Sequence, residues 1–401
     1  MPSHRTLAAT VAALLATVAL AGAPPAAHAK RVNPKTAPRA FDSEVAYFYR
    51  VVACAGDRPV AEDIAKIVED HCKQLGERIA AYRKSFVDKA TVFFDKVRPA
   101  GLPDTVVYPF GGGDLVSALV TFPGAREITT MSLEHAGDPT RLETLTPKQL
   151  KKQLKLFREV IRGLLVNHDS ESDQLKKLET GGIPGQLAFF VTGMAIMGYQ
   201  PVSLRYFHLA DDGTVVYYTI DEVDQLRERV AKKKSSTWVD TDWSEVFSNS
   251  EIELQKVGDP SVTIVHRHLA ANLDDKHFPG SPVEKYLDAR GSKVSMMTKA
   301  ASYLLWMSSF SAIRDWVGTH LAWMASDSTG LPPRWAKKLG LEQETYGKYN
   351  GSIFKVGASD QAAFAKVWAK QKYRKLGFRY GYRDVDGNPH LVITRPREDP
   401  K

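Results

Sequence analysis

A run of three glycines is the feature of this sequence that most suggests a chemical site. Gly111–Gly113 follow the β-rich segment TVVYPF and precede Asp114 and the apolar segment LVSALVTF. A glycine turn between a strand and a helix lets the backbone approach a ligand, and the first N–H groups of that helix point at anions. A second β-rich segment, EITTMSL, ends beside Glu134, where a carboxylate can accept hydrogen bonds from hydroxyls. Tyr108, Gly112, Asp114 and Glu134 are therefore candidate ligand-binding residues.

The order of strand, glycine turn, helix, strand and acidic residue resembles the first β-α-β unit of Rossmann-like enzymes. It is more closely similar to S-adenosylmethionine methyltransferases, where an FP-G-A segment before the second strand is common, as in residues 122–125 here. The resemblance spans about thirty residues and implies a nucleotide-type cofactor whose ribose meets Glu134. The chain departs from it because the GxGxxG spacing is missing and Asp114 would repel a pyrophosphate. We therefore predict no cofactor, and either a capped β-α turn or a site for another polar ligand.

The region from residue 105 to 350 is also similar to an uncharacterised group of exported bacterial proteins. This resemblance implies a shared site and brings no activity with it. The residues that carry it are Tyr108-Pro109-Phe110 with Asp114, Phe122-Pro123, Leu133-Glu134, the run from Lys299 to Leu304, Asp327-Ser328-Thr329-Gly330 with Pro332, and Tyr346-Gly347 with Tyr349.

Four polar residues further along the chain are candidates to complete the site from other loops. Lys299 and Ser302 are three residues apart on a predicted helix and would share one face. A lysine near a serine can act as the base for a nucleophile, although a buried lysine paired with a carboxylate is the simpler interpretation. Asp327 opens a DSTG loop that leads to Arg334, and this loop either lines a cleft or is organised by side-chain to backbone hydrogen bonds.

Two histidines on one predicted strand suggest a metal site. His266 and His268 alternate along the strand and so share a face, and Asp274, Asp275 and His277 follow them. Such a set could bind zinc or another divalent ion, but the HxHxDH and HExxH arrangements of hydrolases are absent. We therefore predict a polar strand face and no metal ion, with a metal site as the alternative.

The composition is that of a globular protein with a moderate positive charge. The 401 residues include 54 Lys and Arg against 46 Asp and Glu, which gives a formal net charge of +8. The basic residues are spread along the chain, which favours a solvated surface, gives only weak support for contact with acidic polymers or lipid headgroups, and indicates no nucleic-acid partner.

Both the N-terminus and the cysteine content indicate export. Residues 1–29 combine a basic start, an apolar run and the small-x-small segment Ala27–Ala29, which is typical of a secretory signal peptide. The apolar run is too short for a retained membrane span. Cys54 and Cys72 are the only cysteines, and a lone pair in an oxidising compartment predicts a disulfide. We expect a periplasmic or secreted protein.

The elements that must position these residues alternate between strands and helices. Helical periodicity runs from Asp42 to Val97, strand-like segments follow from residue 105, and residues 146–167 and 183–198 read as further helices. Residues 295–326 read as two more helices, and turns near residues 211–213 and 386–387 predict two hairpins.

This pattern predicts an α/β fold with a Rossmann-like core sheet, flanking helices, two β-hairpins and an N-terminal helical extension. The predicted organisation is a signal peptide (1–29), a leader with a helical extension (30–100) and an α/β core domain (101–401).

The predicted function is recognition of a small polar or glycan ligand at the carboxyl ends of the strands, where open α/β sheets place their sites. Two alternatives remain at this point. The same cleft could serve a hydrolase or transferase with Asp114 or Glu134 as general base, or the chain could be an envelope protein that binds a partner without catalysis. The sequence does not indicate an oligomeric state.

Overall fold

The computed structural model describes residues 34–162, 183, 185–232, 246–352 and 357–397. The predicted signal peptide (1–29) lies outside these residues. None of the described helices is long and apolar enough to cross a membrane.

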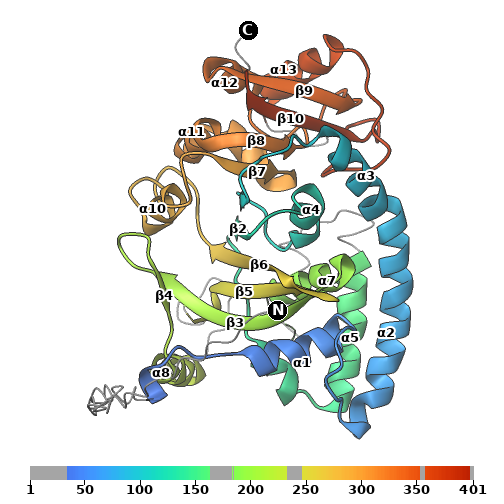
Figure 1. Cartoon of the computed structure of the whole chain (residues 1–401), viewed down its shortest axis with the longest axis vertical. Helices are drawn as coiled ribbons and strands as arrows, with labels where there is room; N and C mark the ends of the chain where they lie inside the picture. The colour runs from blue at the N-terminus through green and yellow to red at the C-terminus, as the bar shows by residue number, and fades with distance from the viewer. Residues whose placement is uncertain (1–33, 163–182, 184, 233–245, 353–356, 398–401) are drawn as a thin grey trace, which may run out of the picture.

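One ten-stranded mixed sheet forms the centre of the molecule. In Figure 1, β9 and β10 lie at the top of this sheet and β3, β4 and β5 at the bottom. In chain order the strands are β1 (Thr105–Tyr108), β2 (Glu127–Ser132), β3 (Tyr199–Leu209), β4 (Val215–Tyr217), β5 (Asn249–Lys256), β6 (Asp259–Ala270), β7 (Val294–Thr298), β8 (Leu321–Ser326), β9 (Leu341–Gly347) and β10 (His390–Pro396).

The strand order is β4-β3-β5-β6-β2-β1-β7-β8-β10-β9. The five central strands β6, β2, β1, β7 and β8 are parallel. If these five strands are numbered 1 to 5 in chain order, their order across the sheet is 3-2-1-4-5. This is the order of a Rossmann sheet. The predicted α/β fold with a Rossmann-like core sheet is therefore confirmed. The order reverses between β1 and β7, so the loops that follow these two strands diverge at that point.

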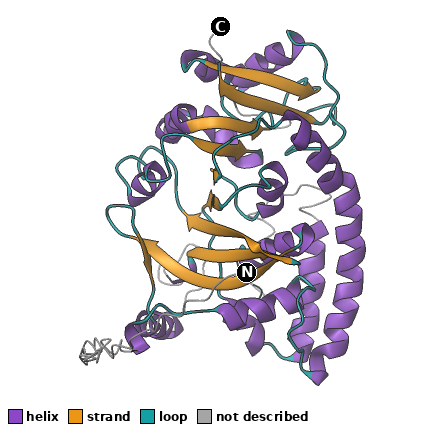
Figure 2. Ribbon diagram, in the orientation of Figure 1, coloured by secondary structure: helices purple, strands orange, loops and turns teal. Residues whose placement is uncertain are grey.

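Helices cover both faces of the sheet (Figure 2). They are α1 (Asp42–Val52), α2 (Glu62–Tyr82), α3 (Asp88–Val97), α4 (Leu115–Thr121), α5 (Pro147–Arg162), α7 (Leu187–Met197), α8 (Ile220–Lys232), α10 (Pro282–Asp288), α11 (Ser311–His320), α12 (Pro333–Lys338) and α13 (Ala358–Ala369), with a π turn η2 (Arg83–Val87) joining α2 to α3 and short 3-10 turns η1 (Pro34–Thr36), η3 (Pro139–Thr144), η5 (Ala300–Trp306) and η6 (Ser308–Phe310).

Successive side chains of a strand point to opposite faces of the sheet, so each strand supplies two cores. Val106 and Ile128 point into a core formed with α1, α2, α3, α4, α5 and α7. Val107 and Met131 point into a second core, formed with α10 and α11. Burial on both faces explains why β1 reads as a nearly continuous apolar run, and it also encloses Thr129 and Thr130 of β2.

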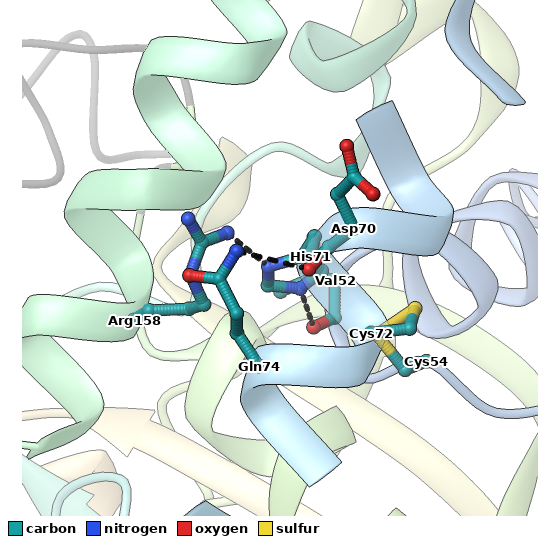
Figure 3. Close-up of a disulfide and its surroundings, with 7 residues drawn as sticks. All are labelled: Val52, Cys54, Asp70, His71, Cys72, Gln74 and Arg158. Carbon is teal, nitrogen blue, oxygen red and sulfur yellow. Dashed lines mark hydrogen bonds between the residues drawn. A yellow bond between two sulfur atoms is a disulfide. The ribbon is translucent and has the colours of Figure 1, made fainter. Parts of the chain in front are cut away.

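The helices predicted between Asp42 and Val97 are formed, and the predicted disulfide joins the end of α1 to α2. Cys54 follows α1 and Cys72 lies on α2, and the two are bonded with their Cα atoms 5.2 Å apart (Figure 3). Beside the bond, His71 contacts the carbonyl of Val52 at 3.0 Å through Nε2 and the guanidinium of Arg158 at 2.9 Å through Nδ1. Burial lowers the pKa of His71 to about 4, so the ring is neutral here.

The leader is ordered where it is described, because the N–H of Phe41 donates to the carbonyl of Leu204 on β3 at 3.0 Å.

Two sequence predictions about the C-terminal half are wrong. Residues 295–326 are not two helices: they hold most of β7 and all of β8, with η5, η6 and α11 between them. Apolar runs that form central buried strands have no alternation to distinguish them from buried helices. The hairpin expected around residues 386–387 is also absent, because β10 pairs with β8 and β9. The two hairpins of the sheet are β3–β4, as predicted, and β5–β6.

Candidate functional site

The glycine turn lies at the point where the strand order reverses, and its geometry needs glycine. Phe110 and Gly112 have positive φ values of 60° and 44°. A Cβ on Gly111 would lie 2.4 Å from the ring of Tyr108, so the turn folds back against the last residue of β1. The N–H of Gly112 donates to the carbonyl of Met131 at 3.3 Å, which ties the turn to β2.

Asp114 caps α4 and forms an ion pair with Lys299. Its Oδ1 accepts from the N–H of Ser117 at 3.3 Å. Its Oδ2 accepts from the hydroxyl of Tyr108 at 3.0 Å and lies 2.6 Å from Nζ of Lys299. Lys299 directly follows β7 and also donates to the hydroxyl of Ser117 at 2.7 Å. The structure thus joins the loops after β1 and β7, and supports the interpretation of Lys299 as a lysine paired with a carboxylate.

Aromatic side chains from both ends of the chain cover this ion pair. Nζ of Lys299 lies 5.6 Å from the ring centroid of Phe86 in η2 and 5.3 Å from that of Tyr380. Tyr82 at the end of α2 is so enclosed that burial, with a smaller contribution from Asp114, raises its pKa well above the usual value. The side chains of Asp114 and Lys299 are only 21% and 16% exposed. The two charges neutralise each other, which suits a structural link better than a general base.

Asp327, after β8, organises a second set of loops. It is fully buried. Its carboxylate accepts from the N–H of Thr329 at 2.8 Å, of Ala300 at 3.1 Å and of Tyr382 at 3.2 Å. Ser302 contacts Thr329 through their hydroxyls at 2.9 Å. Asp327 therefore organises loops by side-chain to backbone hydrogen bonds, which was one of the two sequence interpretations.

Two expected associations are not formed. Lys299 is extended at the end of β7, with φ −157°, whereas Ser302 lies in η5 and faces Thr329, so the two do not share a helix face. Arg334 at the start of α12 forms an ion pair with Asp360 of α13 at 3.2 Å, and its side chain is 58% exposed. Arg334 is thus drawn to α13 rather than to the glycine turn.

Glu134 lies beside a buried glutamine that the sequence analysis did not single out. Gln186, just before α7, is fully buried, and its amide nitrogen donates to the hydroxyl of Ser132 at 2.9 Å and to Glu134 at 3.5 Å. Its carbonyl oxygen Oε1 is buried and has no hydrogen-bond partner among the residues that the structure describes. A Cβ on Gly113 would lie 2.9 Å from this oxygen, so Oε1 faces the glycine turn.

The backbone around Gln186 explains its position. Gly185 has a φ of 71°, and a Cβ there would lie 2.2 Å from the carbonyl oxygen of Ala136. The N–H of Gln186 donates to His135 at 3.0 Å, and that of Leu187 to Ala136 at 2.9 Å. The segment before α7 therefore crosses closely over the loop after β2. The sequence signal that could have found Gln186 is the Pro-Gly-Gln segment at the start of a strongly apolar helix.

His266 and His268 are part of the core. Both are fully buried, and both contact the hydroxyl of Thr130, at 3.0 Å and 3.2 Å. His268 also contacts the carbonyl of Glu134 at 2.7 Å. Burial lowers the pKa of His266 to about 3 and that of His268 to about 4, so both rings are neutral. Within the described part of the chain, no group of three or more His, Cys, Asp or Glu side chains is placed to hold a metal ion.

No family model, curated protein or solved structure matches this chain. The function is therefore inferred from the arrangement of the site.

Proposed function

We propose that this protein binds a small ligand rich in hydroxyl groups, such as a sugar or a nucleoside, at the carboxyl ends of β1 and β2. The observation that carries the proposal is the unpaired Oε1 of the buried Gln186, which faces the glycine turn. A buried acceptor without a partner destabilises a protein by about 1–3 kcal/mol. A ligand hydroxyl that donates to this oxygen would remove that penalty, and because Oε1 is buried against Gly113, the glycine turn must move to admit it.

The chemistry of the neighbouring groups selects the ligand class. The carboxylate of Glu134 and the amide oxygen of Gln186 are both hydrogen-bond acceptors, and the two side chains contact each other. Two adjacent acceptors suit adjacent donors, and neighbouring hydroxyls of a sugar ring provide them. The position also agrees with the general rule that open α/β sheets bind ligands outside the carboxyl ends of the strands, and it adjoins β1, one of the two strands between which the strand order reverses.

Other members of the expected site have supporting roles in this proposal. Tyr108, Asp114 and Lys299 hold the glycine turn in place through their mutual contacts. Asp327 fixes the loops that follow β7 and β8. Catalysis is not part of the proposal, because the Asp114 carboxylate is already engaged by a cation and two hydrogen-bond donors.

The proposal is tested by measuring binding of monosaccharides, nucleosides and S-adenosylmethionine by thermal shift and then by calorimetry. We expect at least one hydroxyl-rich compound to bind, and Glu134→Gln and Gln186→Leu each to weaken it about tenfold or more, since hydrogen bonds to charged or buried groups are worth about 1.5–3 kcal/mol. Glu77→Gln, the same charge change on the exposed face of α2, is the matched control and should bind as the wild type does. Absence of binding by every compound, or unchanged affinity in both site variants, would rule the proposal out.

We also infer that the protein acts outside the cytoplasm. The disulfide between Cys54 and Cys72 supports this, because such bonds persist in oxidising compartments. The signal-like residues 1–29 support it independently. Fractionation of cells that produce the full chain tests the inference. A chain that retains residues 1–29 and stays in the cytoplasm would contradict it.

A further inference from the structure

The exposed face of α5 carries a row of four lysines in the first half of the helix, and this row ends before the exposed Glu159. Lys148, Lys151, Lys152 and Lys155 are separated by three, one and three residues, so they lie together on one side of the helix. All four are exposed. The opposite side of α5 is apolar and packs into the core through Leu150, Leu154, Phe157, Val160 and Ile161. We call these four residues the lysine row.

The lysine row is unfavourable within the chain itself. Positive charges three or four residues apart on a helix repel each other. They also lie in the first half of α5, whose first turn holds no acidic residue, although the partial positive charge at a helix N-terminus favours acidic residues there. None of the four lysines forms an ion pair with any residue that the structure describes. The helix is held by its core face and by the Thr146 cap, which donates to and accepts from Gln149.

We propose that the lysine row docks the protein onto an anionic lipid surface. The row covers about 10 Å along the helix axis at 1.5 Å per residue, and a plane of lipid phosphates can meet all four ammonium groups at once. Lysine behaves as a mobile point charge, which suits a fluid array of headgroups, whereas recognition of one fixed phosphate favours the planar fork of arginine. The apolar face of α5 is already buried in the core, so the contact is electrostatic, with no insertion into the bilayer.

The location of α5 leaves its exposed face accessible. In Figure 1, α5 lies on the lower right of the molecule beside α2, far from α13 and the C-terminal strands at the top. This contact does not involve the proposed ligand site, so the two proposals can fail separately.

The test is sedimentation of the full-length chain with vesicles of phosphatidylcholine alone and with about one-third phosphatidylglycerol. Each lysine near an anionic surface is worth about fivefold in partitioning. Replacing all four with glutamine should therefore weaken binding to the anionic vesicles at least a hundredfold. The wild type should also lose most of its binding when the salt concentration rises from about 0.05 M to about 0.5 M. Residues 1–29 are present in the wild type and in every variant. Binding to the uncharged vesicles measures any contribution that these residues make.

A matched control has the same change in charge at the other end of the molecule. Lys366, Lys370, Lys372 and Lys375 are also exposed, and their replacement by glutamine should leave vesicle binding within about threefold of the wild type, because these residues lie away from the docking face. The row variant should melt no lower than the wild type, since glutamine is a good helix former and the repulsion is removed. Equal loss in both quadruple variants, no binding of the wild type to anionic vesicles, or binding to DNA in place of vesicles would overturn the proposal.

Discussion

The ion pair between Asp114 and Lys299 should couple the loops after β1 and β7 strongly enough to be measured in a double-mutant cycle. Asp114→Asn keeps the shape of the cap and its contact with Tyr108 and removes the charge. Lys299→Met keeps an unbranched side chain against Phe86 and Tyr380 and removes the other charge. The double variant has neither charge.

The expected coupling follows from the burial of the pair. Two unit charges 2.6 Å apart attract with about 6 kcal/mol at an effective dielectric constant of about 20, but desolvation removes much of this. Exposed pairs are worth less than about 1 kcal/mol, and breaking a fully buried pair destabilises by about 3–5 kcal/mol. With side chains only 21% and 16% exposed, we expect each single variant to lose about 2–3 kcal/mol in the free energy of unfolding. The double variant should lose no more than either single one.

The assay is urea unfolding followed by tryptophan fluorescence, with all four proteins measured in one buffer. The coupling free energy should be about 2 kcal/mol or more, since the two single losses do not add. It should fall only slightly in high salt, because a buried pair is poorly screened. A coupling below about 0.5 kcal/mol, or losses that add, would show that solvent screens the pair and would refute the structural role given to it.

Three further predictions concern the rest of the fold. Replacing both Cys54 and Cys72 with serine should lower the free energy of unfolding by about 3 kcal/mol for a separation of 18 residues; equal urea midpoints with and without the bond would contradict this. Arg267→Met removes the cation that Glu251 and Glu127 share at 2.7 and 2.8 Å. Glu127 keeps its ion pair with Arg290 at 2.6 Å, whereas Glu251 keeps, among the described residues, only the Tyr217 hydroxyl at 2.8 Å, so this variant should lose about 3 kcal/mol, the lower end for a broken buried pair. Arg126→Met removes a pair that is 85% and 55% exposed and should lose less than about 1 kcal/mol, as urea midpoints will show. The pKa of His268 is lowered to about 4 by burial, so the unfolded chain takes up its proton first as the pH falls. The contribution of His268 to stability, complete above about pH 6.5, should decline by up to about 1.4 kcal/mol per pH unit down to about pH 4. The buried His71 and His266 add to the slope in the same direction, so His268→Asn should make the decline shallower without abolishing it; an unchanged pH slope in this variant would count against a neutral His268.

The first half of the fold could be predicted because its signals are local. The helices from Asp42 to Val97 show an apolar stripe with a period of 3.6 residues, which only a helix presents to one side. The strand, glycine turn and helix from Thr105 to Thr121 follow from β-rich residues, conformational freedom at the turn and an N-terminal cap at Asp114. The disulfide followed from having two cysteines and a signal-like N-terminus.

The partners of the candidate site residues could not be predicted in the same way. Sequence spacing placed Lys299 and Ser302 on one face of a helix, but β7 ends at Thr298 and the chain turns through Ala300, which has a φ of 61°. As a result Lys299 meets Asp114, which is 185 positions earlier in the chain, and Ser302 meets Thr329. Only the parallel pairing of β1 with β7 brings the first of these pairs together.

By itself, the amino-acid sequence determined the period of each amphipathic element, the positions of its turns and caps, and the cysteine pair, because these depend on residues close together in the chain or on their number. The tertiary structure decided which buried runs became β7 and β8, that β10 pairs with β9, and that Gln186 faces the glycine turn. The physical reason is that the pairing of central strands is fixed by packing on both faces at once. That packing depends on residues far apart in the chain, which no local pattern records.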